Sequence, residues 1–460
     1  MRKIIQYMMM ALIAVVLASC ANDISEESTP TVKSNIRFVV DDFPMFEKPS
    51  TRTIGEEDKG KTAWVVGDEI CVKLESKELG TQTATLKYNG VKFEIQDGNS
   101  LCYLEGEPVT AYAYYAPGRK WLNDGYLGYK DDGEDGIAEF IEATCNVHYG
   151  DDNYIDISFA NVTRNYSRLR IATMPNKPIT VDFTEFTPSG GWDFQHPAGS
   201  YDLTSDEKGN AYLYGTFDRY AEVTVKYREA TLATHTFLQA TEKAKSYALD
   251  ATVISANSAE EIKSAIKQEV ADGKTAIRLN LASDAGDNEF KAIREAFENV
   301  KGYSTIDLTL IGCKEIPADG LNNQSGGLEA LKSITLPDVT KIGKNALLFC
   351  VDLEEICAPN VSAIDEYAFE RCDYLKKVTL GELTNVKGDY EHGGVIFGLN
   401  SSIENIDLYL PKNQEVMKGE FDKNSYQYIW KPTGESYFAS PDYDNGIFLG
   451  YQFKSVRSWE

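Results

Sequence analysis

The chain has 460 residues, which at the usual ~100–200 residues per domain indicates about three domains. Hydrophobic residues make up 42% of the sequence and aromatic residues 11%, so each domain can bury a core. The formal net charge of -25 argues against a nucleic-acid partner, because no basic face is available to neutralise phosphates.

The N-terminus, residues 1–19, has the form of a secretory signal peptide. Arg2 and Lys3 precede an apolar run, Ile4 to Leu17, that is too short to span a bilayer stably. The run ends in Leu-Ala-Ser followed by Cys20, which resembles the lipobox of bacterial lipoproteins. The resemblance implies that Cys20 becomes the first residue and carries acyl chains such as palmitate, which hold the protein on a membrane.

Residues 20–33 are interpreted as the lipidated cysteine and an acidic tether. The stretch "ANDISEESTPTVK" is polar and lacks apolar periodicity. Asp23, Glu26 and Glu27 resemble the acidic signal that directs lipoproteins of Bacteroides-type bacteria to the outer face of the outer membrane. We therefore expect a surface-exposed, lipid-anchored protein of the outer membrane.

Residues 34–252 have the pattern of antiparallel β-sandwiches. Short segments rich in Tyr, Thr, Val and Phe alternate between polar and apolar residues, and Gly, Asn and Asp separate them. This length exceeds that of one sandwich, so we predict one over residues 34–153 and a second over residues 154–252. Strands are expected at residues 35–40, 69–74, 109–117, 154–160, 167–173, 211–217 and 221–227.

Five motifs in this region are Thr51-Arg52-Thr53, "WVVGDEICV" (64–72), "AYAYYAP" (111–117), "IDISFANV" (155–162) and "KSYALD" (245–250). Their order and spacing resemble the fimbrillin family of two-sandwich lipoproteins, although Ala116 interrupts one motif. Members of that family build or anchor fimbriae. Cleavage behind an arginine releases an N-terminal strand and leaves a groove for a strand of another subunit. The resemblance implies that Arg52 is a candidate processing site.

Beyond residue 255 the apolar spacing alternates between that of helices and that of strands. Ser258 begins a capping box, which predicts a helix that starts there. A second helix is expected with Asp287 as its N-cap, and strands are expected at residues 276–282 and 305–312.

The sequence after residue 330 repeats with a period of 22. The apolar residues Leu331, Ile334, Leu336, Val339, Ile342, Ala346 and Cys350 recur as Leu353, Ile356, Ala358, Val361, Ile364, Ala368 and Cys372. A third copy begins at Leu375 and a fourth at Ile403, 28 residues later, because residues are inserted near 390–395. A fixed period with Leu-x-x-Ile-x-Leu predicts a leucine-rich solenoid.

The proline after the repeated strand, Gly343 and the closing cysteines resemble the BspA-like leucine-rich repeats of bacterial surface antigens, although Asp365 replaces the glycine in the second copy. The resemblance implies a solenoid with a helical N-terminal part over residues 255–411. The motif "GYQFKSV" (450–456) resembles a capping strand, so residues 412–460 are expected to form a C-terminal cap. The expected fold class is multidomain, with all-β sandwiches followed by an α/β leucine-rich repeat solenoid.

The cysteines at the end of the first two copies, Cys350 and Cys372, are expected to lie in adjacent coils, where strands are about 4.8 Å apart. That distance would permit a disulfide. Free, buried thiols are the favoured interpretation, because strand pairing already holds the coils together.

The four histidines, His148, His196, His235 and His392, lie in none of the motifs of metalloproteases or hydrolases. The sequence leaves carboxylate pairs for glycoside hydrolysis open, because their separation depends on the fold. Neither family that the chain resembles is catalytic, and the resemblance therefore implies no catalytic activity and no cofactor.

The acidic segment at residues 131–142 has part of the pattern of a calcium-binding loop. Asp131, Asp135 and Glu142 fall at positions 1, 5 and 12 of a calcium-binding loop. Gly133 occupies position 3, however, and no helix flanks the segment, so a solvated acidic loop is favoured over a metal site.

The outward positions of the repeated strand form a candidate binding face, because the apolar positions between them point into the solenoid. These residues are Ser333, Thr335, Glu355, Cys357, Lys377, Thr379, Asn405 and Asp407. The favoured function is a non-catalytic adhesin or binding module for a host protein or glycan, displayed on a fimbrillin-like stalk. The alternatives are a fimbrial anchor or tip subunit, which would contact other fimbrial subunits, and a glycan-capture lipoprotein.

Overall fold

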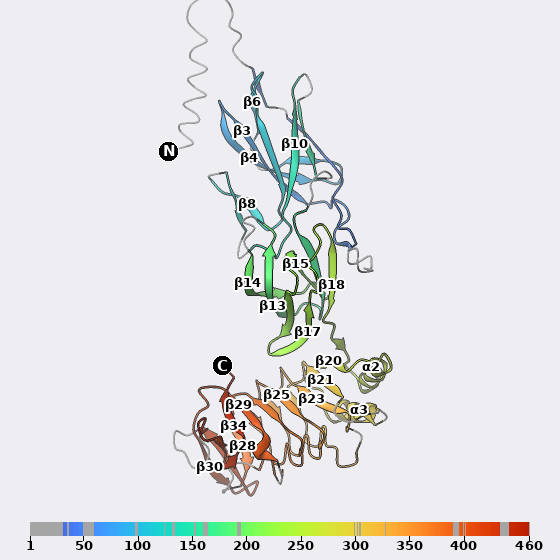
Figure 1. Cartoon of the computed structure of the whole chain (residues 1–460), viewed down its shortest axis with the longest axis vertical. Coiled ribbons are helices and arrows are strands. Elements are labelled where there is room, and N and C mark those ends of the chain that lie inside the picture. The colour runs from blue at the N-terminus through green and yellow to red at the C-terminus, as the bar shows by residue number, and fades with distance from the viewer. Residues whose placement is uncertain are drawn as a thin grey trace, which may run out of the picture. The chain divides into compact units, whose positions relative to one another are not determined.

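The computed structural model divides the chain into two compact units. The first comprises Met1–Pro44, Ala63–Asp132 and Phe140–Val162, and the second comprises Met45–Thr62, Gly133–Glu139 and Thr163–Glu460 (Figure 1). The structure describes residues 31–34, 36–48, 59–96, 100–123, 125–130, 134–150, 153–159, 164–190, 195–298, 300, 302, 305–326, 328–389, 395–398, 400, 402–432 and 441–459. The predicted sites at Cys20, Arg52 and Asp131 lie outside the described residues.

The first unit, here the first β-domain, is built on one seven-stranded sheet. Its order is β2 (Arg37–Val40), β11 (Tyr154–Ser158), β10 (Ile141–His148), β7 (Thr110–Tyr115), β3 (Glu69–Ser76), β4 (Gly80–Tyr88) and β5 (Phe93–Ile95). Two strand pairs flank it, β1 (Val32–Lys33) with β6 (Tyr103–Leu104) and β8 (Arg119–Trp121) with β9 (Leu127–Tyr129). The end strands β2 and β5 contact each other, so the sheet curls around its core. There, Trp64 makes edge contacts with Phe43, Phe93 and Phe159.

The second β-domain, which begins the second unit, repeats this design. Its sheet has the order β17 (Ala230–Thr236), β16 (Glu222–Tyr227), β13 (Pro178–Pro188), β15 (Asn210–Phe217), β12 (Ser167–Ala172) and β18 (Ser246–Asp250). A further strand, β14 (His196–Thr204), pairs with β13. The end strands β17 and β18 again contact each other.

The division between these β-domains differs from the predicted one at residue 154. Strand β11 pairs with β10 and β2, so the first β-domain extends to Val162. In addition, the described residues 45–48, 59–62 and 134–139 belong to the second unit, although the segments that flank them belong to the first. The ring of Phe46, which is 3% exposed, contacts the ring of Tyr166 in the second unit.

Each β-domain contains one parallel strand pair in an otherwise antiparallel sheet. The first-domain pair is β2 with β11, and the second-domain pair is β12 with β18. In each case an early strand lies beside the last strand and runs in the same direction. A parallel pair needs a long connection, which the rest of the domain supplies. The chain therefore enters and leaves each β-domain at opposite ends.

The repeat domain, residues 254–459, holds the two α-helices of the described residues, α2 (Ala259–Ala271) and α3 (Asp287–Phe297). The side chain of Ser258 accepts a hydrogen bond from the Glu261 amide, so the predicted cap of α2 is confirmed. Asp287 is the first residue of α3 rather than its cap. Gly286 occupies the cap position, and its amide donates to the Glu289 carboxylate over 2.9 Å.

The repeat domain also contains two stacked sheets. All strand pairs of the larger sheet are parallel. Its order is β19 (Ile254–Ser255), β20 (Ala276–Asn280), β21 (Ile306–Ile311), β23 (Leu331–Thr335), β25 (Glu355–Ala358), β27 (Lys377–Leu380), β29 (Asp407–Leu410) and β34 (Ser455–Ser458) (Figure 1). The smaller contains β22 (Glu315–Ile316), β24 (Lys341–Ile342), β26 (Ala363–Ile364), β28 (Asn385–Gly388), β31 (Gln427–Pro432) and β30 (Met417–Asp422). The short strands β32 (Ile447–Phe448) and β33 (Tyr451–Gln452) form a separate pair. The predicted capping strand, residues 450–456, is not one strand: it contains β33 and the first two residues of β34. Strand β34 completes the larger sheet.

The predicted α/β class of this domain is wrong, because the domain is mostly β. In each copy the return path between the larger and the smaller sheet consists of turns. These turns recur with the 22-residue period: Asn345 and Tyr367 share a positive φ (55° and 60°), as do Phe349 and Arg371 (63° and 60°). A left-handed residue every few positions is incompatible with a helix in the return path.

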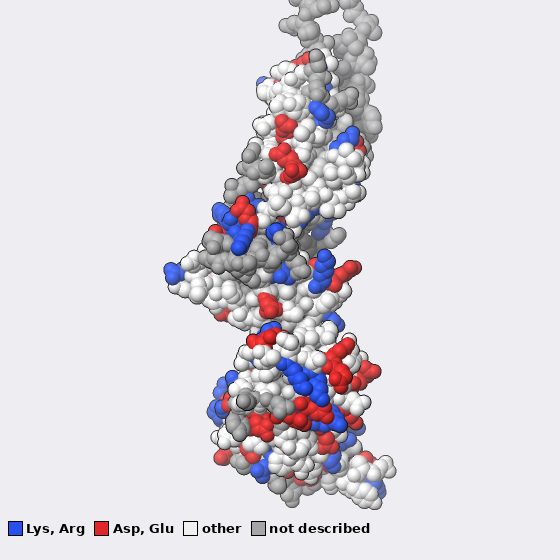
Figure 2. Space-filling model, turned by 90° about the vertical axis from the view of Figure 1, so that its right-hand side faces the viewer, with Lys and Arg blue, Asp and Glu red and all other residues white. Residues whose placement is uncertain are grey.

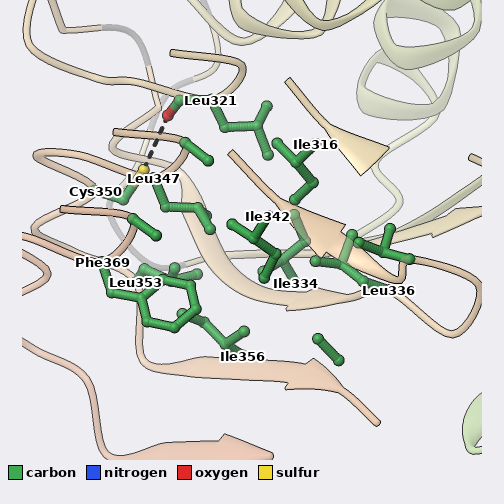
Figure 3. Close-up of a cluster of buried hydrophobic side chains, with 14 of the residues drawn as sticks. Ile316, Leu321, Ile334, Leu336, Ile342, Leu347, Cys350, Leu353, Ile356 and Phe369 are labelled. Carbon is green, nitrogen blue, oxygen red and sulfur yellow. Dashed lines mark hydrogen bonds between the residues drawn. The ribbon is translucent and has the colours of Figure 1, made fainter. Parts of the chain in front are cut away.

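The core of the repeat domain lies between the two sheets (Figure 3). Ile334 and Ile356 stack in register on adjacent strands, and both are 0% exposed. At the far edge of the core, Cys350 donates its thiol hydrogen to the Leu321 carbonyl over 3.2 Å (Figure 3). Cys372 does the same to the Leu347 carbonyl over 3.2 Å.

Among the described residues, no helix is long and apolar enough to cross a membrane.

Candidate functional site

The outward side chains of the larger sheet form two polar rows. The first row contains Asp307, Ser333, Glu355, Lys377, Asp407 and Ser455, and the second contains Thr309, Thr335, Cys357, Thr379, Tyr409 and Arg457. Together they are the outer face of the repeat domain. The face exists because all these strands are parallel and in register, so equivalent positions of successive copies lie side by side.

Seven of the eight predicted residues lie on this face, and Asn405 does not. Asn405 ends the 3₁₀ helix η3 (Ile403–Asn405), and Asp407 occupies the position beside Lys377 that was expected for Asn405. Tyr409 occupies the position beside Thr379 that was expected for Asp407. The prediction aligned Ile406 with Val378, whereas the structure pairs Leu408 with Val378. The insertion before η3 lengthens this step to 30 residues. The alternation in "DLYL" (407–410), which matches "KVTL" (377–380), is the signal in the sequence that identifies the correct register.

Hydrogen bonds and ion pairs connect neighbours along the first row. Ser333 donates to Asp307 over 2.7 Å, Lys377 Nζ lies 2.6 Å from Glu355 Oε1, and Ser455 donates to Asp407 over 2.5 Å. Lys454 Nζ also lies 2.7 Å from Asp407 Oδ2 and, with Ser455, holds the pKa of that carboxyl below its usual value. These exposed pairs cost little to break, so a ligand can exchange them for its own contacts.

The second row is least accessible at Thr309 and Thr379 and more accessible at its C-terminal end. Thr309 and Thr379 are each 8% exposed. Burial raises the pKa of the Cys357 thiol to about 11. Beyond them Tyr409 lies with its ring centroid 5.8 Å from Lys377 Nζ, and Arg457 donates to Ser455 over 3.0 Å. Lys377, Tyr409 and Arg457 therefore combine positive charge with an aromatic ring at the open end of the face.

The charged side chains on the protein surface are mixed in sign. On the face shown in Figure 2, Lys and Arg lie next to Asp and Glu. In the smaller sheet of the repeat domain, Lys341 pairs with Glu315, and Lys387 Nζ lies 3.2 Å from Asp365 Oδ1. Such pairing satisfies the charges locally.

The calcium candidates give no metal site in the part of the chain that the structure describes. Asp135 uses its carbonyl oxygen to accept a hydrogen bond from Tyr201 over 2.7 Å, whereas Glu142 lies on β10 in the first β-domain. The described residues contain no group of three or more His, Cys, Asp or Glu side chains that could hold a metal ion.

The thiols of Cys350 and Cys372 are free and buried, as the sequence indicated. Burial raises the pKa of Cys350 to about 12 and raises that of Cys372 well above its usual value. An unfolded thiol titrates at about pH 8.5. Neither thiol should therefore react with iodoacetamide at pH 8.5 in the folded protein.

The same pKa shifts predict a loss of stability at alkaline pH. Above about pH 8.5 the unfolded chain loses protons that the folded protein keeps, so each thiol should lower the free energy of unfolding by about 1.4 kcal/mol per pH unit. The contribution is complete below that pH and declines as pH rises. Urea unfolding between pH 8 and pH 10 measures this slope, and Cys350→Ala should reduce it. An equal slope in wild type and variant would contradict the assignment.

A cleft of about 500 Å³ lies in the second β-domain, beside the end strands β17 and β18. Its lining includes Leu169, His235, Phe237, Gln239, Tyr247 and Leu249. Leu238, on the loop that borders the cleft, is 72% exposed. The end strands of a sheet carry backbone groups that can pair with a further strand.

Comparison with known proteins identifies part of the repeat domain. A family model described as "BspA type Leucine rich repeat region (6 copies)" matches residues 294–425. The comparison with curated proteins gave no match.

Two solved structures are similar at low scores. A candidate cell adhesion protein from Bacteroides fragilis is 11% identical, covers 47% of this chain and 92% of its own, and has a TM-score of 0.25. A shaft pilin from Lactobacillus rhamnosus GG is 10% identical, covers 48% of this chain and 95% of its own, and has a TM-score of 0.16. Scores of this size carry no argument about function. The comparisons thus place BspA-type leucine-rich repeats in residues 294–425 of a mostly β, multidomain chain.

Proposed function

We propose that this protein is a non-catalytic adhesin of the bacterial outer surface. In this proposal the repeat domain is a leucine-rich repeat solenoid that binds a host protein or glycan through its outer face. The observation that carries the proposal is the pair of continuous polar rows, which run from β21 to β34 across the repeats matched by the BspA-type family model. Repeated strands in register offer an extended docking surface.

The two β-domains serve as a stalk. Support for this role comes from the parallel pairs β2–β11 and β12–β18, which let the chain enter each β-domain at one end and leave at the other. Such domains add length between an N-terminal anchor and a C-terminal binding domain. The anchor would be the acylated Cys20, in a chain delivered to the outer membrane.

The anchor and the display on the cell surface are tested in cells. Cys20→Ala should abolish incorporation of labelled palmitate and release the protein from the membrane fraction. Protease treatment of intact cells should degrade the wild-type protein. Complete resistance to the protease, together with unchanged fractionation of Cys20→Ala, would contradict the proposed location.

The binding role is tested with the mature chain on immobilised matrix proteins and glycans. Lys377→Glu and Tyr409→Ala should each weaken binding at least ~10-fold, equivalent to ~1.4 kcal/mol, because both residues lie at the accessible end of the outer face. Lys226→Glu, which breaks an exposed ion pair with Asp182 in the second β-domain, is the matched control. Equal affinity of all three variants and the wild type would place the ligand elsewhere.

A second candidate function is that of a fimbrial anchor or tip subunit. The cleft beside β17 and β18 favours it, because an extended strand from another subunit could pair with these end strands. Electrophoresis of unboiled cell envelopes tests this role: bands of higher mass that disappear on boiling support assembly, and a single band contradicts it. Glycan capture is a third candidate, and the glycans in the binding assay address it.

A further inference from the structure

Asp338 is a buried carboxylate where the second β-domain meets the repeat domain. It is 3% exposed, although it follows β23 in a turn of the repeat. Its Oδ2 accepts a hydrogen bond from the Gly312 amide over 2.9 Å. Its Oδ1 lies 3.1 Å from Arg228 Nη1 and 3.7 Å from Lys314 Nζ, and accepts a hydrogen bond from the Tyr227 hydroxyl over 3.4 Å. These five residues are the interdomain lock.

The partners of Asp338 come from both domains. Gly312 and Lys314 follow β21 in the repeat domain, whereas Tyr227 and Arg228 belong to the turn between β16 and β17 in the second β-domain. Arg228 has a φ of 52°, and its guanidinium also donates to the Pro337 carbonyl over 3.3 Å. One arginine therefore contacts both the carboxylate and the backbone of the repeat turn.

Apolar contact accompanies the lock. Ile311, the last residue of β21, is 1% exposed and packs in the core of the second β-domain. Ala251 and Val253, on the segment between the two domains, belong to the same core. The two domains thus share buried side chains directly beside the polar contacts, and both belong to one compact unit.

The site favours aspartate over asparagine at position 338. Every partner of Asp338 is a donor: an amide, a guanidinium, an ammonium group and a hydroxyl. A carboxylate offers only acceptors and satisfies all four, whereas an asparagine amide would turn two donor hydrogens toward them. Asn360 holds the equivalent position in the next copy, where its side chain donates to the Pro337 carbonyl over 2.8 Å. In the first copy the equivalent side chain instead contacts Arg228 and Tyr227 of the second β-domain.

We propose that Asp338 locks the second β-domain to the repeat domain, so that the two move as one rigid body. In this proposal the aspartate at position 338, where the next copy has Asn360, serves to bind the second β-domain of the same chain and not an external ligand. This proposal does not depend on the proposed function, because it concerns contacts within the chain. A buried charge of this kind is costly to leave unpaired, so loss of either Asp338 or Arg228 should free the joint.

Hydrogen exchange of the full mature chain tests the lock. Asp338→Asn and Arg228→Gln should each accelerate exchange in peptides covering residues 226–230 and 310–314 at least ~10-fold, the factor expected from the loss of ~1.4 kcal/mol. The double variant should accelerate exchange by less than the product of the two single effects, because both substitutions remove the shared Arg228–Asp338 contact. Glu354→Gln is the matched control, since it breaks an exposed ion pair with Lys376 in the repeat domain.

The outcomes separate the lock from general damage to the fold. Unchanged exchange of both peptides in Arg228→Gln would overturn the proposal, and so would additive effects in the double variant. Arg228 lies on a surface turn with its side chain 46% exposed, so its variant should fold even where Asp338→Asn does not. Equal acceleration by Glu354→Gln would also overturn the proposal, because the effect would then not depend on the joint.

Discussion

Arg164→Ala is expected to lower the free energy of unfolding of the second β-domain by about 3–5 kcal/mol. Arg164 Nη2 lies 2.9 Å from Glu139 Oε2, and the two side chains are only 2% and 8% exposed. The guanidinium also lies 4.0 Å from the centroid of the Phe46 ring. Truncation leaves the Glu139 carboxylate buried without its cation, which is the costly outcome for a buried pair.

This expectation is checked by urea unfolding followed by circular dichroism. Lys226→Ala is the control, because Lys226 pairs with Asp182 over 2.6 Å in the same domain with both side chains 38% exposed. An exposed pair of this kind should contribute less than ~1 kcal/mol. Equal losses from the two substitutions would show that Glu139 is not buried against Arg164. They would also remove the evidence that residues 134–139 pack on the second β-domain.

Ile356→Ala is expected to destabilise the repeat domain by about 2–5 kcal/mol. The side chain is 0% exposed and lies between Ile334 and Val378 in the stacked strands. Because interiors are close-packed, its truncation leaves a cavity that the neighbouring copies can fill only partly. The loss should appear in urea unfolding followed by tryptophan fluorescence, to which Trp430 and Trp459 of this domain contribute two of the five tryptophans of the chain.

Glu355→Ala is the matched control for this substitution. Glu355 precedes Ile356 on the same strand, but its side chain points outward and is 38% exposed. Its truncation should change the free energy of unfolding by no more than ~0.5 kcal/mol. A control that destabilises as much as Ile356→Ala would mean that the strand is not oriented with Ile356 inward.

Local patterns in the chain were sufficient to predict most elements. Alternation of polar and apolar residues predicted β3, β7, β12 and β16, and the 22-residue period predicted which positions of β23, β25 and β27 face the core. These predictions succeed because side-chain direction follows from the period of the backbone, which a short window of sequence contains. The outer face follows from the same rule as far as Thr379.

Predictions failed where the local pattern was interrupted or where a distant segment decided the outcome. The insertion near residues 390–395 hid the true register of β29, so Asn405 was assigned to the position beside Lys377 that Asp407 holds. The return path of each copy was assigned to an α/β fold, although left-handed residues such as Asn345 direct it into turns. Neither feature changes the apolar period, so periodicity could not reveal it.

Composition, periodicity and capping motifs were thus enough to establish the β-rich stalk region, the helices α2 and α3 and the repeated strands, because each depends on residues close together in the chain. Only the tertiary structure showed that Phe46 and Glu139 pack on the second β-domain, and that Asp338 meets Arg228 across 110 residues of sequence. These contacts depend on burial and on donor–acceptor pairing between distant segments. The sequence contains the residues, but nothing near them in the chain indicates their partners.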